Sequence, residues 1–174
     1  MTHAALAAWM FLAATPPAAT QPNSGVPLPR VGGERLQGLL TPAGRPRLIH
    51  LWASWCGPCL AEWPSLAEAL RRWAPDVDIV TLALEAGDAG EGAQQVLGHV
   101  PTHVGEAAWA PMDEAFPVIR GLDAEWDGAL PTTVLLGSDG KVALLQRGIT
   151  LLKPLDAAIQ ELPRAKTVKR REKP

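Results

Sequence analysis

The sequence predicts an α/β fold in which a central mixed β-sheet is flanked by helices. An apolar run at 48–53, a helical segment at 56–73 and a second apolar run at 77–84 indicate a βαβ unit with parallel strands. Farther along, 132–136 and 142–147 flank a Ser-Asp-Gly-Lys turn, which is typical of an antiparallel hairpin. Parallel and antiparallel pairs in one chain make the predicted sheet mixed.

Length and composition fit one globular domain with terminal extensions. The chain has 174 residues, 47% of them hydrophobic and 20% charged, and its formal net charge is -2. These values are ordinary for soluble proteins and give no reason to expect nucleic acid as a partner. We expect a signal peptide or N-terminal anchor at 1–22, a domain at 23–164 and a basic, disordered tail at 165–174.

The leader predicts export. Residues 4–14 form an apolar stretch that suits the core of a secretory signal and is too short to cross a bilayer, although no Lys or Arg precedes it. We therefore expect a periplasmic or otherwise exported protein, either soluble or anchored by its N-terminus. An apolar leader on a cytosolic protein is the alternative.

The remaining elements are predicted from shorter patterns. Residues 35–40 suggest a short strand and 41–44 a turn, so we expect an N-terminal β-hairpin extension before the strand at 48–53. A weak helix is expected at 91–99, followed by a short strand at 100–104.

Two prolines make the next segment hard to assign. Pro111 and Pro117 interrupt helical periodicity between residues 109 and 126, so the segment looks less regular than expected and a helix is hard to recognise there. Residues 151–162 carry apolar side chains at the spacing of an amphipathic helix, which we expect to cover one face of the sheet.

The only two cysteines lie three residues apart, in Trp55-Cys56-Gly57-Pro58-Cys59, directly after the first predicted strand. A helix that starts there places Cys56 where unpaired N–H groups and the helix dipole favour a thiolate. We predict that Cys56 is an exposed nucleophile and that Cys59 is its resolving partner. A structural zinc site needs four ligands, so we predict no metal.

The segment 51–59, Leu-Trp-Ala-Ser-Trp-Cys-Gly-Pro-Cys, resembles the active-site strand and helix of thioredoxins, and 129–136 resembles their cis-proline loop. The resemblance implies a thioredoxin-like fold, with the redox-active disulfide Cys56-Cys59 in place of a bound cofactor. It also implies that a client protein binds at Trp55, Gly57, Pro58, Leu130 and Pro131.

Residues 59–64, Cys-Leu-Ala-Glu-Trp-Pro, are similar to the CxxExP pattern of the TlpA/ResA-like branch, which includes the thioredoxins of cytochrome c maturation. The resemblance implies that Glu62 lies near the cysteines and influences their titration. The alternative is a solvated helix carboxylate. It also implies a membrane electron donor of the DsbD/CcdA kind, because an exported dithiol otherwise stays oxidised.

His50 stands where cytoplasmic thioredoxins carry an aspartate, six residues before Cys56. Its imidazole is a candidate base for the Cys59 proton or, as a cation, a group that lowers the thiol pKa. The alternative is a neutral core histidine that is hydrogen-bonded to a backbone carbonyl.

These observations predict a thiol-disulfide oxidoreductase, expected to be a monomer, that reduces protein disulfides in exported proteins. Two alternatives stay open. One is a copper(I) metallochaperone that uses Cys56 and Cys59 with His99 or His103, since thiolates are soft ligands. The other is a redox-inert fold with a structural disulfide.

Overall fold

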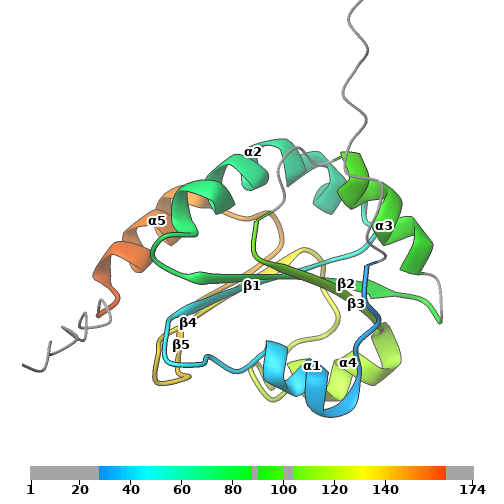
Figure 1. The fold of residues 1–174 in the computed structure, drawn as a ribbon, viewed down its shortest axis with the longest axis horizontal. Helices are drawn as coiled ribbons and strands as arrows, with labels where there is room; N and C mark the ends of the chain where they lie inside the picture. The colour runs from blue at the N-terminus through cyan, green and yellow to red at the C-terminus, as the bar shows by residue number, and fades with distance from the viewer. Residues whose placement is uncertain (1–27, 88–89, 100–103, 164–174) are drawn as a thin grey trace, which may run out of the picture.

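The computed structural model describes residues 28–87, 90–99 and 104–163, so the predicted leader at 1–22 and tail at 165–174 lie outside the described residues. Five strands and five helices form in these ranges (Figure 1). Their order is α1 (Gly33–Leu39), β1 (Arg47–Trp52), α2 (Gly57–Trp73), β2 (Asp78–Glu85), α3 (Gly90–His99), β3 (Glu106–Pro111), α4 (Met112–Ile119), β4 (Thr132–Leu136), β5 (Val142–Arg147) and α5 (Leu152–Glu161).

The strands form one mixed sheet in the order β3-β2-β1-β4-β5. β1 pairs in parallel with β2, and β2 pairs in parallel with β3. β4 runs antiparallel to both β1 and β5. The predicted βαβ unit, the hairpin and the mixed sheet are therefore confirmed, and the chain leaves the central strand β1 directly before the two cysteines.

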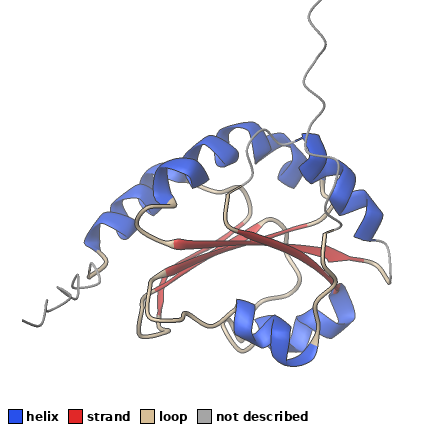
Figure 2. Cartoon of the chain, in the orientation of Figure 1, coloured by secondary structure: helices blue, strands red, loops and turns tan. Residues whose placement is uncertain are grey.

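Helices cover both faces of the sheet: α2, α3 and α5 lie on one face, and α1 and α4 lie on the other (Figures 1 and 2). The side chains of β1 divide accordingly. Leu48 and Trp52 belong to the apolar core under α2, whereas Ile49 and Leu51 belong to the core on the α1 and α4 face. Because side chains alternate along a strand, His50 points to the α2 face.

The N-terminal β-hairpin extension is wrong, because residues 35–40 lie mostly in the helix α1. Leu36, Leu39 and Leu40 are buried at the spacing i, i+3 and i+4, which is the period of a helix and not of a strand. The isolated β-bridge of this part of the described chain is parallel and joins Arg30 to Trp109.

The segment after residue 109 is more regular at its start than the sequence indicated, because Met112–Ile119 form the helix α4, whereas 120–131 hold no helix or strand. Pro111 lies just before α4, where its missing N–H costs no helical hydrogen bond, and Pro117 lies within α4 on the exposed side. Ala115 and Ile119 are buried and hold the helix against the sheet. The strand expected at 100–104 falls largely outside the described residues, and β3 follows it.

Candidate active site

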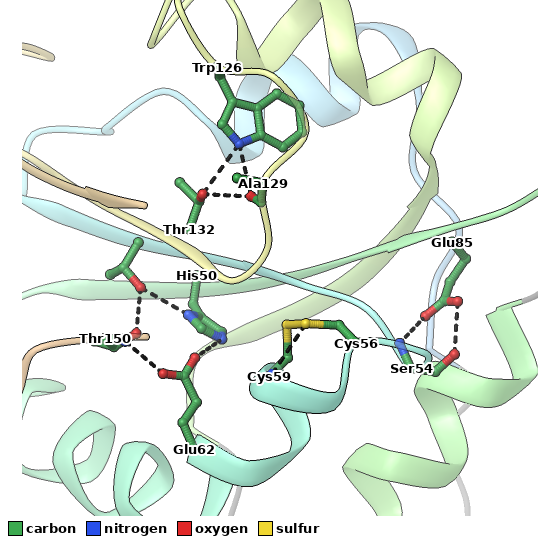
Figure 3. The surroundings of a disulfide bond; sticks show 11 residues. His50, Ser54, Cys56, Cys59, Glu62, Glu85, Trp126, Ala129, Thr132 and Thr150 are labelled. Atoms are coloured by element: carbon green, nitrogen blue, oxygen red, sulfur yellow. Dashed lines mark hydrogen bonds and ion pairs between the residues drawn. A yellow bond between two sulfur atoms is a disulfide. The ribbon is translucent and has the colours of Figure 1, made fainter. Parts of the chain in front are cut away.

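Cys56 occupies the N-cap of α2, and Cys59 lies in its first turn. The Sγ of Cys56 accepts a hydrogen bond from the backbone N–H of Cys59 at 3.2 Å, and Pro58 occupies the start of the helix, where no N–H partner is needed. The two cysteines form a disulfide with a Cα–Cα distance of 5.3 Å. The predicted position of the pair at the end of β1 is confirmed (Figure 3).

Cys56 is nearly buried in this disulfide form, contrary to the expectation of an exposed nucleophile. Its relative exposure is 5%, against 0% for Cys59, because both cysteines are part of the apolar core under α2. The side chain of Trp55 is 60% exposed, and Gly57 and Pro58 are exposed as well. A partner therefore meets this rim before it reaches Cys56.

The peptide bond between Leu130 and Pro131 is cis, as the resemblance implied. Leu130 is partly buried and packs against the core that contains both cysteines. The carbonyl of Pro131 accepts a hydrogen bond from the N–H of Gly148 at 2.7 Å. Trp126 anchors the preceding loop, because its Nε1–H donates to the carbonyl of Ala129 at 3.1 Å.

Glu62 is buried, so its interpretation as a solvated helix carboxylate is wrong. Its relative exposure is 7%, and Oε2 accepts a hydrogen bond from the backbone N–H of Thr150 at 2.7 Å. Burial raises the pKa of Glu62, while the hydrogen bonds from Thr150 oppose that rise. Glu62 lies one turn after Cys59 on α2, on the same side of the helix.

His50 is fully buried beside Glu62. Its Nε2 lies 3.4 Å from Oε1 of Glu62, and its Nδ1 lies 3.0 Å from Oγ1 of Thr133, a hydroxyl partner instead of the expected backbone carbonyl. The rings of Trp63 and Trp52 stack edge to face above it, with Trp63 centred 5.5 Å from the imidazole. Burial lowers the pKa of His50 to about 3, so the ring is neutral at physiological pH and the predicted cation is not favoured.

Relatives with named functions match this chain in sequence and structure. It is 24% identical to the thioredoxin-like protein YneN of Bacillus subtilis over 133 residues, 74% of this chain and 71% of YneN. It is 37% identical to the thiol:disulfide interchange protein DsbE homolog of Paracoccus denitrificans over 40% of this chain and 42% of that protein, so it spans less than half of that relative. No family model matches the sequence.

The fold also matches a solved structure, that of a thiol:disulfide interchange protein DsbE from Chlorobium tepidum. The TM-score is 0.54 with 26% identity, covering 67% of this chain and 79% of that one. The chain has a thioredoxin-like fold and is similar in sequence to thioredoxin-like proteins. With its Cys56–Cys59 pair at the start of α2, this thioredoxin-like protein is a thiol-disulfide oxidoreductase.

A second buried carboxylate of this thioredoxin-like protein escaped the sequence analysis. Glu85, at the end of β2, is 1% exposed and accepts two hydrogen bonds from Ser54, one from its N–H at 2.8 Å and one from its hydroxyl at 2.9 Å (Figure 3). Ser54 lies two residues before Cys56. The signal was present, because a Glu directly after an apolar parallel strand lies at the same sheet edge as the residues that follow β1.

Thr133 and Thr150 were missed as well. Their hydroxyls bond to each other at 2.9 Å, which links the partner of His50 to the partner of Glu62. The described residues hold no group of three His, Cys, Asp or Glu side chains arranged for a metal ion. His103 and the side chain of His99, invoked for copper(I), lie outside what the structure describes. Within the described ranges, no helix is both long and apolar enough to cross a bilayer.

Proposed function

We propose that this thioredoxin-like oxidoreductase works as a reductase of disulfides in exported proteins. The observation that carries the proposal is the place of Cys56 at the N-cap of a 17-residue helix, where its sulfur already accepts a hydrogen bond from the Cys59 N–H. Such a position stabilises negative charge on sulfur. The dithiol itself carries the electrons, so the proposal needs no other cofactor.

The reaction consists of two exchanges. The thiolate of Cys56 attacks one sulfur of a client disulfide, forms a mixed disulfide and releases the other client sulfur as a thiolate. Cys59 then gives up its proton, and its thiolate attacks the Sγ of Cys56. This step releases the second client thiolate and leaves the Cys56–Cys59 disulfide. Two electrons pass to the client, whose thiolates take up protons from water and from the group that accepted the Cys59 proton.

Two sets of residues assist these steps. Glu62, with its raised pKa and its place one turn after Cys59, is the proposed acceptor for the Cys59 proton, and His50 is its partner. The proposed client surface combines the exposed rim of Trp55, Gly57 and Pro58 with the partly buried Leu130 and the buried Pro131 beside it.

The proposed setting is the periplasm or another exported compartment, with the protein as a monomer that is soluble or anchored by its N-terminus. Support comes from the apolar stretch at 4–14 and from relatives that are named DsbE and ResA. An oxidising compartment returns the dithiol to a disulfide, so a membrane donor of the DsbD/CcdA kind is the proposed electron source.

Insulin reduction in the presence of dithiothreitol tests the activity. We expect turnover by the unmodified chain, none by Cys56→Ser, and an accumulating mixed disulfide with Cys59→Ser, because that variant lacks the resolving thiol. Glu68→Ala, a substitution at an exposed position of the same helix, is the matched control. An unmodified chain that forms its disulfide but does not reduce insulin would contradict the proposal and favour a structural disulfide.

Equilibration with glutathione buffers tests the direction of electron flow. A reduction potential of about −270 mV, like that of thioredoxin, supports a reductase. A potential of about −120 mV, like that of a strong periplasmic oxidant, would make the chain an oxidant and overturn the proposal.

Apocytochrome c is the proposed client, on the resemblance of residues 59–64 to the pattern of the cytochrome c maturation branch. An oxidised Cys-x-x-Cys-His peptide, the haem attachment sequence, is the test substrate. We expect a higher kcat/KM for this peptide than for the same residues in scrambled order with the same cysteine spacing. Equal values would argue for a general reductase.

A further inference from the structure

A cavity of about 340 Å³ lies at the edge of the sheet that carries the disulfide. Residues 85–87, at the end of β2, line it together with Met112, Asp113 and Phe116 of α4. β1, β2 and β3 are parallel and therefore end at the same edge, where the antiparallel β4 begins. Figure 1 shows the start of α2 and the start of α4 at this edge, on opposite faces of the sheet.

The β2 side of the cavity is connected to the turn before Cys56. Glu85 accepts two hydrogen bonds from Ser54, two residues before Cys56 (Figure 3). Because Ala83 belongs to the core under α2 and side chains alternate along a strand, the side chain of Glu85 points to the α2 face. Its carboxylate is therefore engaged by Ser54, on the face opposite to α4.

The α4 side of the cavity is connected to the cis-proline loop. The rings of Phe116 and Trp126 are centred 5.3 Å apart. A Cβ added at Gly128 would lie 3.8 Å from Cε2 of Phe116, so this ring also borders the loop backbone. Trp126 in turn donates to the carbonyl of Ala129. The cavity thus lies between the segment that leads to Cys56 and the loop that leads to Pro131.

The lining combines an apolar wall with one available carboxylate. Met112 and Phe116 are half-buried and pack against the core on the α4 face. Asp113 is exposed and forms no ion pair within the described ranges of the chain. None of the lining residues is basic. A thioether and a phenyl ring favour an alkyl chain, and a carboxylate favours a cation at its end.

The charged residues beside the lining already have partners. Glu114, next to Asp113, forms an ion pair with Arg30 at 2.6 Å. Arg120 lies over the ring of Phe116, with its Cζ 5.9 Å from the centroid, and its Nε–H donates to the carbonyl of Ala124 at 2.9 Å. Asp113 is therefore the group of this cavity that can pair with a cation from outside.

The spacing of the strands relates the cavity to a bound client. Neighbouring strands are about 4.8 Å apart, so the end of β3 lies roughly 10 Å from the end of β1, and an extended peptide covers that span with about three residues. We infer that the cavity binds a lysine or arginine side chain of the client, about three residues from the cysteine that joins Cys56. The inference rests on the proposed function and gives it a substrate preference.

Competition between peptides for Cys56 tests the inference in the Cys59→Ser chain, which retains mixed disulfides. Each peptide has a single cysteine and carries Lys, norleucine or Glu two, three or four residues from it, on either side. Exchange binds one peptide sulfur to Cys56 and releases another as a thiolate that takes up a proton, so there is no net oxidation. Lys and norleucine have the same alkyl stem, and their ratio in the mixed disulfide therefore isolates the charge.

We expect the Lys peptide to be favoured about fivefold over the norleucine peptide at one of these positions, measured by mass spectrometry at low ionic strength. Asp113→Asn should lower the ratio to about one, and Asp113→Lys should favour the Glu peptide over the Lys peptide. Asp113 is exposed, so neither substitution disturbs the core. Asp76→Asn, which removes an exposed carboxylate before β2 at the opposite edge of the sheet, is the control and should keep the ratio.

Equal binding of the Lys and norleucine peptides at every position would show an apolar site and overturn the inference. An unchanged ratio in Asp113→Asn would overturn it as well, because the charge would then act from elsewhere. Failure of the proposed function is distinguishable from both outcomes. It appears as an unmodified chain that does not reduce insulin, whereas the competition needs only a reactive thiol at Cys56.

Discussion

Two glutamates lie in buried positions on opposite sides of the disulfide, and their hydrogen bonds differ. Glu85 accepts from two donors of Ser54, one at each carboxylate oxygen. Glu62 accepts from the N–H of Thr150 at Oε2, while its Oε1 has no hydrogen-bond partner among the described residues and lies 3.4 Å from Nε2 of His50. Both side chains are at most 7% exposed.

The difference teaches that burial by itself does not prepare a carboxylate for proton transfer. Glu85 has donors for both oxygens, so it holds Ser54 and with it the turn that leads to Trp55 and Cys56. Glu62 has one oxygen without a donor, and burial raises its pKa. A buried carboxylate binds a proton when donors are missing, and serves as a structural anchor when donors are present.

The largest expected effect is on the pH dependence of stability, and it tests whether His50, which lies beside Glu62, is neutral in the fold. The pKa of His50 is about 3 in the fold and about 6.5 when unfolded, so its contribution to stability is complete above pH 6.5 and is lost as the pH falls toward 3. Between pH 7 and pH 4 we expect this loss to be about 3 kcal/mol of unfolding free energy, measured by urea denaturation of the oxidised chain. His50→Gln should lack this part of the pH dependence, and identical slopes in the two proteins would contradict it.

The next largest effect is on the rate of disulfide exchange, where Glu62 and Glu85 should behave differently. Glu62→Gln should slow resolution of the mixed disulfide at pH 7 by roughly a hundredfold, because an amide cannot accept the Cys59 proton. Glu85→Gln is the matched control and should keep the pH profile of the unmodified chain. Stopped-flow kinetics from pH 5 to 9 distinguishes the two, and a similar change of profile in both variants would remove the distinction.

Replacing Glu85, which holds Ser54 by two hydrogen bonds, should lower the free energy of unfolding. Glu85→Ala leaves the N–H and the hydroxyl of Ser54 without their acceptor, and we expect the free energy of unfolding to fall by about 2 kcal/mol. Ser54→Ala removes only the hydroxyl bond and should cost about 1 kcal/mol. Urea denaturation at pH 7 measures both. A loss in Glu85→Ala no larger than in Ser54→Ala would show that the bond to the Ser54 N–H contributes little.

The smallest expected effect is a gain in stability, which we expect when Glu62 is replaced by glutamine. Because the pKa of Glu62 is raised in the fold, its favourable contribution is present below its unfolded pKa and is lost as the pH rises through the folded value. Ionised Glu62 therefore opposes folding at pH 8, and Glu62→Gln should be up to about 1 kcal/mol more stable there. At pH 4 the gain should disappear. A variant that is less stable than the unmodified chain at pH 8 would contradict the prediction.

The parts of the fold predicted from sequence have strong local patterns. β4 and β5 occupy the predicted residues, α2 begins one residue later than predicted, and α5 is one residue shorter than predicted at each end. The segments that were predicted wrongly or not recognised, at 35–40 and 112–119, contain one glycine and one proline respectively, and burial of a few side chains decided their conformation. In α1, Leu36 and Leu39 supply that burial, and in α4, Ala115 and Ile119 do so.

The sequence by itself determined the chemistry of this protein, because Cys56 and Cys59 are the only thiols and their three-residue spacing at a strand-to-helix turn is a local property. It also identified His50 and Glu62 as candidates. Only the tertiary structure decided what these two residues face. Thr133 is 83 residues from His50, and Thr150 is 88 residues from Glu62. Strand register and helix packing bring them together, and no pattern within a short window contains that information.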